Sequence, residues 1–183
     1  MKYRTIVADP PWEVARLESP GSQGFGTQKR VLRSVALPYA TMSQREICTL
    51  PVARLADESA HLYLWTINRY VETSYMVARA WGFRPVTLLT WAKKPMGLGP
   101  GGAYSQTTEH VLFARRGKLQ ALRRVDSTWW EWPRREHSAK PEAFLDLVEQ
   151  VSPAPRLELF ARTQRLGWDS WGHECLNHVE LAP

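Results

Sequence analysis

Short apolar segments with strand character alternate along this chain with segments of helical spacing. The predicted strands are residues 3–8, 61–66, 86–92, 110–115, 156–161 and 168–171. The predicted helices lie near residues 43–51, 70–81 and 140–151. This alternation is typical of an α/β fold with a mainly parallel, doubly wound sheet and helices on both faces. Ligands of such folds bind beyond the carboxyl ends of the strands, so the residues there are candidates for chemistry.

The length and composition predict one domain with a substantial core. The chain has 183 residues, of which 44% are hydrophobic, so we expect a single domain over residues 1–183. No apolar run approaches the roughly 18–20 residues of a membrane span. A strand-like run begins at residue 3, which leaves no room for a signal peptide, and the two cysteines make no disulfide framework. We therefore expect a cytoplasmic protein, in a bacterial or phage-infected cell.

Two long segments show no period and are expected to be loops. Residues 13–38 are polar and rich in Gly, Ser and Arg, and residues 93–107 are rich in Gly. Loops of this length in a compact domain are usually lids or binding loops. Residues 97–102 match the pattern GxGxxG, but Pro100 interrupts it and a predicted strand follows. A dinucleotide loop opens a helix instead, so we interpret this segment as a lid.

The first predicted strand ends in Asp9-Pro10-Pro11-Trp12, which fits a site for a planar base with an exocyclic amine. The lone pair of such an amine is delocalised into the ring, and two acceptors aimed at its N–H bonds would make it more nucleophilic. The Asp9 carboxylate and the Pro10 carbonyl are the candidate acceptors, held rigid because proline fixes φ. Trp12 offers a face on which the base can stack. The alternative is a proline turn with an N-capping Asp.

The positive charge of the chain is concentrated in one segment. The formal net charge is +6, and residues 115–135 hold seven basic and two acidic residues together with three of the nine tryptophans. Arg115 and Arg116 begin this segment. A basic segment with aromatic side chains is typical of nucleic-acid binding, because cations attract phosphates and rings stack on bases. The alternative is a solvated loop whose tryptophans pack on the body or on a second subunit in a homo- or heterodimer.

A second group of motifs lies near the C-terminus. Ser138-Ala-Lys140-Pro opens the last predicted helix, Glu158-Leu-Phe160-Ala-Arg162 follows on a strand, and Trp168-x-x-x-Gly172-x-Glu174 comes next. With Asp-Pro-Pro-Trp ahead of them, these motifs resemble the DPPW-type adenine-N6 methyltransferase family from about residue 3 to residue 174. That family includes the catalytic subunit of the eukaryotic mRNA N6-adenosine methyltransferase and short bacterial and phage DNA enzymes.

The resemblance implies a Rossmann-like fold that uses S-adenosyl-L-methionine (SAM), with the catalytic motif ahead of the cofactor motif. It places Asp9 near the SAM amino group as well as the target amine. Lys140 would face the SAM carboxylate or the base, and Phe160 would line the cofactor pocket. A lysine at a helix N-terminus also adds positive charge to a site that favours anions.

The remaining implied contacts follow the last two strands. Arg162, Gln164 and Arg165 stand where the family contacts the ribose and the carboxylate end of SAM. His173 and Glu174 stand where it holds the ribose, and a carboxylate suits two ribose hydroxyls. The sequence departs from the eukaryotic pattern here, because Gln164-Arg165 replaces His-Asn and His173-Glu174 replaces Asn-Gln.

The family also implies substrate contacts near the long loops. We expect Tyr104, in the second loop, to contact the substrate, and Glu109 matches a family acid close to the target base, although a solvated Glu would fit the sequence equally well. Both long loops would close over the base. The arrangement His173-x-Cys175-x-x-His178 lacks a fourth ligand at zinc-site spacing, so we expect no metal.

The predicted function is transfer of a methyl group from SAM to adenine N6 in DNA, with RNA as the alternative substrate. The target base would have to leave a duplex to reach Asp9. A non-catalytic nucleic-acid-binding partner subunit is an alternative from another class, but such subunits lose the Asp-Pro-Pro-Trp motif. Cytosine-N4 or small-molecule amine methylation is a further alternative.

Overall fold

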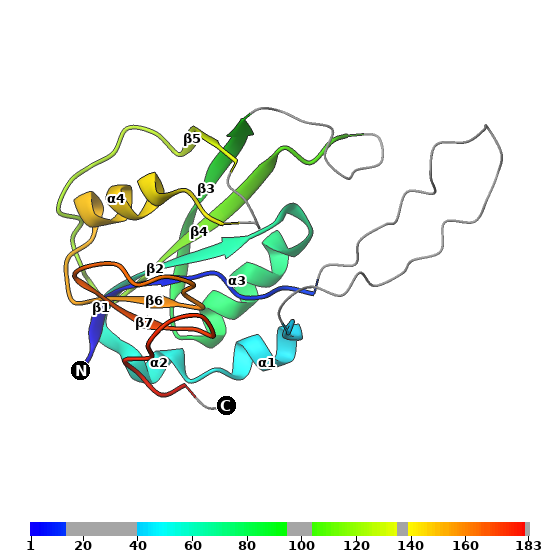
Figure 1. The fold of residues 1–183 in the computed structure, drawn as a ribbon. Coiled ribbons are helices and arrows are strands. Elements are labelled where there is room, and N and C mark those ends of the chain that lie inside the picture. Colours follow the sequence, from blue (N-terminus) through cyan, green and yellow to red (C-terminus); the bar gives the residue numbers. More distant parts are fainter. Residues whose placement is uncertain (14–39, 95–103, 135–138, 182–183) are drawn as a thin grey trace, which may run out of the picture.

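The structure is a computed structural model that describes residues 1–13, 40–94, 104–134 and 139–181, and its centre is a seven-stranded sheet (Figure 1). The order across the sheet is β5-β3-β4-β2-β1-β6-β7. The strands are β1 (Tyr3–Ala8), β2 (Ala56–Thr66), β3 (Arg84–Lys94), β4 (Thr108–Arg116), β5 (Trp129–Pro133), β6 (Arg156–Leu159) and β7 (Trp168–Trp171).

Six strands of this sheet run in one direction, and β4 runs against them. β1 pairs in parallel with β2 and β6, β6 with β7, and β3 with β5, whereas β4 is antiparallel to both of its neighbours. The prediction of a mainly parallel sheet is thus confirmed. The chain leaves β1 for β2 on one side and returns later to β6 on the other. A crevice therefore opens at the carboxyl ends of β1 and β6, where α/β folds bind ligands.

Alternation along the strands divides the core between the two faces of the sheet. Ile6 and Ala8 of β1 belong to one buried cluster, and Val7 between them belongs to the other. In β2, Tyr63 and Trp65 face the same way as Val7. Both faces of the strands are thus buried, which explains the apolar runs at residues 6–8 of β1 and 62–65 of β2.

Helices cover both faces, as predicted (Figure 1). They are α1 (Gln44–Thr49), α2 (Val52–Leu55), α3 (Val71–Ala80), which follows a 3₁₀ turn over Asn68–Tyr70, and α4 (Glu142–Val151). Helix α4 packs Phe144 and Val148 against the Val7 face, while Ile47, Val52 and Val77 of the other helices pack on the opposite face. Within the described ranges, no helix is long and apolar enough to cross a bilayer.

Local signals set several helix ends. Ser43 caps α1 in a capping box with Glu46, in which each side chain accepts from the backbone N–H of the other. Gly82 follows α3 with φ +81°, the left-handed conformation expected of a C′ glycine. Helix α4 begins two residues later than predicted, because Pro141 is its N-cap and has extended backbone angles.

The sequence missed or misplaced some elements. β5 was not predicted, because residues 129–133 were interpreted only as part of the basic segment; the structure pairs them with β3 at the edge of the sheet. β6 ends at Leu159 rather than at residue 161, because Phe160 turns the chain with φ +64°. Residues 93 and 94 extend β3 instead of starting a loop. Residues 14–39 and 95–103, which hold most of both predicted lids, lie outside the described residues.

Gly172 offers a test of the packing at the carboxyl end of β7. A Cβ atom there would lie 2.0 Å from the carbonyl oxygen of Ala161, a backbone atom that cannot move independently. We expect Gly172→Ala to lower the free energy of unfolding by about 1–3 kcal/mol, as overpacking does. Urea unfolding measures this, with Glu72→Ala on the exposed side of α3 as control. An unchanged midpoint for Gly172→Ala would contradict the packing.

Candidate active site

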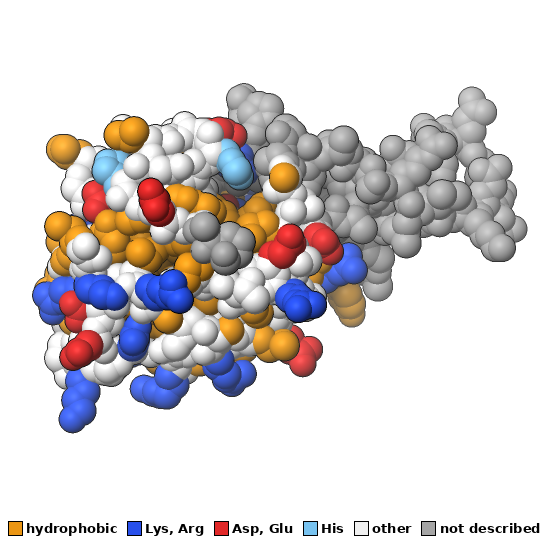
Figure 2. Space-filling view, turned by 90° about the horizontal axis from the view of Figure 1, so that it is seen from below, with side chains coloured by type: hydrophobic (Ala, Val, Ile, Leu, Met, Phe, Trp, Pro, Cys, Tyr) orange, Lys and Arg blue, Asp and Glu red, His pale blue; other side chains and the backbone are white. Residues whose placement is uncertain are grey.

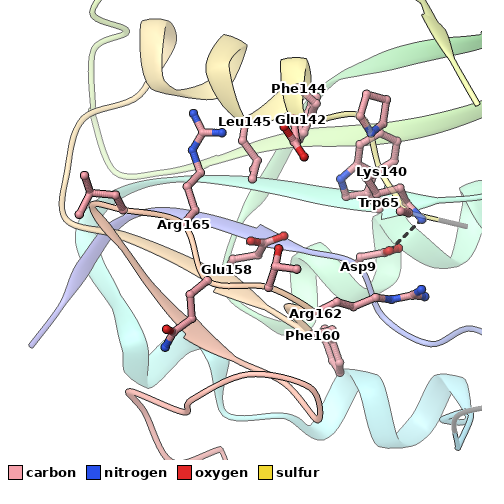
Figure 3. A pocket seen from close by; sticks show the side chains of 15 residues that line it. Asp9, Trp65, Lys140, Glu142, Phe144, Leu145, Glu158, Phe160, Arg162 and Arg165 are labelled. Carbon is pink, nitrogen blue, oxygen red and sulfur yellow. Dashed lines mark ion pairs between the residues drawn. The ribbon is translucent and has the colours of Figure 1, made fainter. Parts of the chain in front are cut away.

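A pocket of about 560 Å³ opens at the carboxyl ends of β1 and β6, beneath the start of α4 (Figure 3). It therefore lies where the sheet topology predicts a ligand site. Its lining residues come from the end of β1, from β2, from residues 139–145 and from residues 158–166. The charged and aromatic ones are Asp9, Trp65, Lys140, Glu142, Phe144, Glu158, Phe160, Arg162 and Arg165.

Asp9 is fixed in this pocket by its backbone and by an ion pair. Its N–H donates to the carbonyl of Leu159 across the β1–β6 boundary at 3.3 Å. Its Oδ2 lies 2.8 Å from Nζ of Lys140, drawn as the dashed line in Figure 3. Burial raises the pKa of Asp9 above its ordinary value, although the Lys140 ammonium opposes this rise. The two residues that the sequence assigned to the amine and the cofactor are thus in direct contact.

Glu109 and Lys93 extend this pair into a row of alternating charges. Glu109 Oε2 lies 3.4 Å from Lys140 Nζ, and Glu109 Oε1 pairs with Lys93, which follows the register partner of Glu109, Trp91, two residues later on β3. Burial by itself would raise the pKa of Glu109, but Lys140 and Lys93 lower it overall. Burial would lower the pKa of Lys140, but Asp9 and Glu109 raise it. Glu109 is therefore a buried partner of Lys140, and its predicted place close to the target base stays a prediction.

Trp12 occupies a different place from the predicted one. Its side chain is only 5% exposed, its ring stacks on Tyr70 at 5.2 Å, and its Nε1 donates to the carbonyl of Trp65 at 3.0 Å. It does not line the pocket. The described structure thus gives Trp12 a role in holding the Asp9-Pro10-Pro11 turn against the core, in place of the stacking face for a base.

The two prolines hold the turn that follows Asp9. The Pro10 carbonyl accepts from the N–H of Trp12 at 2.8 Å, and the Pro11 carbonyl accepts from the N–H of Met42 at 2.9 Å. A carbonyl oxygen has two lone pairs, so Pro10 keeps one for a further donor. The proposed second acceptor for the amine is therefore compatible with this turn.

The turn after β6 forms the lower wall of the pocket. Phe160 has φ +64°, which is uncommon for a bulky residue and is typical of functional sites. Its ring meets Trp171 edge to face at 5.3 Å. Arg162 lines the same pocket, and its positive charge is one of those that lower the pKa of Asp9. The structure thus places both residues in the wall of the pocket, and their contact with a cofactor stays a prediction.

Gln164 and Arg165 also line the pocket, but Arg165 is engaged by α4. Its Nη2 lies 2.5 Å from Oδ1 of Asp146, and its Nε lies 2.8 Å from Oε1 of Glu149. These two pairs tie the loop after β6 to the helix above it. The Arg165 guanidinium thus lies at the pocket, and two of its N–H donors are paired with carboxylates of α4.

Two further pairs of predicted site residues, His173 with Glu174 and Arg115 with Arg116, also lie away from the pocket lining. His173 and Glu174 are exposed and follow the carboxyl end of β7. Gly172, directly before them, packs against Ala161, which comes after the carboxyl end of β6. Arg115 and Arg116 lie at the end of β4, where it pairs with Ala60 and His61 of β2 and with the start of β3, so they are near the amino ends of the parallel strands. Their side chains donate to the carbonyls of Leu119 and Ala53.

Tyr104 is 87% exposed and adjoins the undescribed segment 95–103, so the structure does not place it at the pocket.

Two residues that do belong to the site were missed by the sequence analysis. Lys93 was assigned to a loop, and Glu158 was treated only as part of a motif. Burial and the charge of Asp9 raise the pKa of Glu158 to about 7.

The residues of this pocket suit a zwitterionic ligand beside a polar amine. Carboxylates of Asp9 and Glu158 can accept from ammonium or amine groups, and the cations of Lys140 and Arg162 can hold a carboxylate. Phe160 adds an apolar ring. These donor types fit the amino-acid end of SAM, which carries both charges.

The contact between Lys93 and Glu109 provides a test of the charge row. We expect Lys93→Ala to lower the free energy of unfolding at pH 7 by roughly 1–3 kcal/mol, because Glu109 loses one of its two cations. The folded-state pKa of Glu109 lies below 4.5, so the stabilisation is present above pH 4.5 and is lost as the pH falls below it.

The test is a double-mutant cycle with Glu109→Gln, measured by urea unfolding at pH 7. Lys93→Ala should cost much less in the Glu109→Gln background, and Lys93→Arg should recover most of the loss. Equal costs in both backgrounds would show that Lys93 acts independently of Glu109.

The chain is similar in sequence to known methyltransferases. A type II methyltransferase, M.MunI, from Mycoplasma sp is 31% identical over 191 residues, which cover 98% of this chain and 81% of that enzyme. A probable N(6)-adenosine-methyltransferase MT-A70-like protein of Oryza sativa subsp. japonica is 30% identical over 99% of this chain and 24% of its own length. The human N(6)-adenosine-methyltransferase catalytic subunit METTL3 is 25% identical over 94% of this chain and 28% of its own length. The sequence profile of MT-A70 matches residues 3–174, so it spans β1, the pocket and β7, and the chain belongs to the MT-A70 family of methyltransferases.

Proposed function

We propose that this methyltransferase transfers a methyl group from SAM to the N6 amine of adenine in nucleic acid, with DNA as the preferred substrate. The observation that carries the proposal is the placement of Asp9, half-buried at the end of β1 and paired with Lys140 in the pocket. The names of the relatives support the base and the reaction, since two of them are N(6)-adenosine-methyltransferases.

In this mechanism the two carboxylate oxygens of Asp9 have different partners. Oδ2 faces the Lys140 ammonium, which leaves Oδ1 to accept from one N–H of the target amine. The Pro10 carbonyl can accept from the other N–H. These acceptors orient the nitrogen lone pair toward the methyl donor, so catalysis consists mainly of positioning. SAM supplies an electrophilic methyl group when it is bound.

Several pocket residues are suited to hold that cofactor. Lys140 and Arg162 can bind its carboxylate, Phe160 can contact it through the ring, and Gln164 offers an amide. His173 and Glu174 are proposed ribose contacts, and they follow the carboxyl end of β7, the strand next to β6. Arg165 borders the same end, where it positions the loop through Asp146 and Glu149.

The net positive charge of the chain supports a nucleic-acid substrate. The chain carries a net charge of +6, and Trp129 in the basic segment is 58% exposed. On the face drawn in Figure 2, lysine and arginine side chains are spread among acidic and apolar ones rather than gathered in one patch. Arg115 and Arg116 stand near the amino ends of the parallel strands, opposite the pocket, so any contact they make with phosphates would lie away from the target base.

DNA is preferred over RNA because M.MunI is a type II methyltransferase and the chain covers most of its length. RNA remains the second candidate, since the N(6)-adenosine-methyltransferases are similar over nearly the whole chain. In either case the base must leave a duplex or come from a single strand to reach Asp9.

The test is methylation by the full chain with labelled SAM, followed by digestion to nucleosides. Matched single- and double-stranded DNA and RNA serve as substrates. We expect label on N6-methyldeoxyadenosine, with less on RNA. Label on cytosine, or no label on any nucleic acid, would overturn the proposal.

Asp9→Ala tests the mechanism. Removal of one acceptor for the amine should reduce the methylation rate by about 10²-fold or more, the loss typical of a catalytic hydrogen-bonding group. SAM binding should remain measurable by calorimetry. The control is Glu72→Gln on the exposed side of α3. Activity of Asp9→Ala close to that of the wild type would rule out this role.

A further inference from the structure

Two tryptophan rings of β5 lie stacked on the same side of the sheet as the pocket. Trp130 and Trp132 are two residues apart on one strand, so their side chains project from the same face. Their ring centres are 5.6 Å apart and their planes differ by 3°, which is an offset parallel stack. Trp132 packs against the cluster that contains Val7 and Phe144, so both rings are on the α4 side.

This stack is continuous with the row of charges in the pocket. Lys93 of β3 is the register partner of Trp132. Lys93 pairs with Glu109, and Glu109 contacts Lys140. The row that begins at Asp9 therefore ends beside the two rings. Because β5 is the last strand in the order of the sheet, the stack lies at its edge (Figure 1).

Packing in the core does not account for both rings. Trp91, the register partner of Trp130, is only 4% exposed and already belongs to the buried cluster on this face. Trp132 packs at the margin of that cluster, and Trp130 belongs to neither cluster of the described residues. Both rings keep part of their surface exposed. Contiguous exposed aromatic side chains often mark a binding surface, so the stack has area for a ligand.

The chemistry of the stack suits a flat aromatic ligand that carries negative charge nearby. A nucleobase can add a third layer to two parallel indoles, and such stacking tolerates any base because every base has a π-face. The bases of a duplex already stack on their neighbours, so the ligand is an unpaired base. Lys93 lies beside Trp132, and the exposed Arg134 directly follows β5, so cations for the adjoining phosphates border the rings.

The position of the stack sets its distance from the target base. Four strand spacings of about 4.8 Å separate β5 from β1, which places the rings about 19 Å across the sheet from the strand that leads to Asp9. A nucleic-acid strand rises about 3.4 Å per nucleotide in a duplex and more when it is unstacked, so about six nucleotides or fewer span this distance.

We propose that Trp130 and Trp132 form a stacking platform for an unpaired base of the nucleic-acid substrate, within about six nucleotides of the target adenine. This inference rests on the proposed function and adds a second contact region to it. The platform holds the strand while the target base is in the pocket. It therefore contributes to substrate affinity and not to methyl transfer.

The experiment separates contacts with bases from contacts with the backbone. Fluorescence anisotropy measures binding of a single-stranded oligothymidylate of about 20 nucleotides and of an abasic deoxyribose-phosphate chain of the same length and charge. Trp130→Leu keeps apolar area but removes the ring, and should bind the oligothymidylate about 5- to 100-fold more weakly. Its affinity for the abasic chain should change less than about threefold. Trp130→Phe keeps a ring and should recover most of the loss.

The control is Tyr75→Leu on α3, which removes an aromatic ring that packs on the opposite face of the sheet. Its affinity for either chain should change less than about threefold. The salt dependence of binding adds a second readout. Trp130→Leu removes no phosphate contact, so the slope of log affinity against log salt should match that of the wild type. The wild type should itself prefer the oligothymidylate to the abasic chain, a comparison that requires no variant.

Four outcomes would overturn the platform while leaving the nucleic-acid substrate in place. These are equal affinity of the wild type for both chains, undiminished affinity of Trp130→Leu for the oligothymidylate, and an equal loss of Trp130→Leu for both chains. The fourth is a change in self-association of Trp130→Leu in sedimentation without a change in oligothymidylate affinity, which would assign the rings to a second copy of the chain. Failure of the wild type to bind any DNA or RNA is a separate result, because it would overturn the proposed substrate itself.

Discussion

The ion pair between Asp9 and Lys140 is the contact on which the arrangement of the pocket depends. A carboxylate that is largely shielded from water is stabilised by a nearby cation, and the cation here is Lys140, which precedes α4. The same ammonium contacts Glu109 on β4 and lies 5.2 Å from the centre of the Trp65 ring on β2. One lysine thus ties the end of β1, two further strands and the start of α4 to a common point.

The main features of the fold were predictable from local pattern. The apolar runs of β1 and β2 predicted buried strands, and the glycine after Trp81 predicted a helix end. β5 was not predictable in this way, because tryptophans, a proline and a charge do not alternate clearly. What makes residues 129–133 a strand is the free edge of β3, to which they bond, and that edge exists only in the folded sheet.

For the site, too, local sequence pattern predicted some residues and missed or misplaced others. Asp9, Lys140 and Glu109 were predicted, and the structure brings them into contact. An aromatic residue after two prolines can stack on a base or pack inward, and only the position of Tyr70 decides that Trp12 packs inward. Glu158 lies between Leu157 and Leu159, which is the pattern of a strand with one solvated face. The sequence did not reveal that α4 covers this face and leaves a pocket there.

The charge of the pocket differs from the charge of the whole chain. Three acidic residues, Asp9, Glu142 and Glu158, line it together with three basic ones, Lys140, Arg162 and Arg165. This balance suits a zwitterion better than a phosphate backbone. The net positive charge is carried elsewhere, in part by Arg115 and Arg116 near the amino ends of the parallel strands. The proposed attraction of a nucleic acid and the proposed binding of the small ligand therefore depend on different residues. Only the binding of the small ligand depends on the row of charges around Asp9.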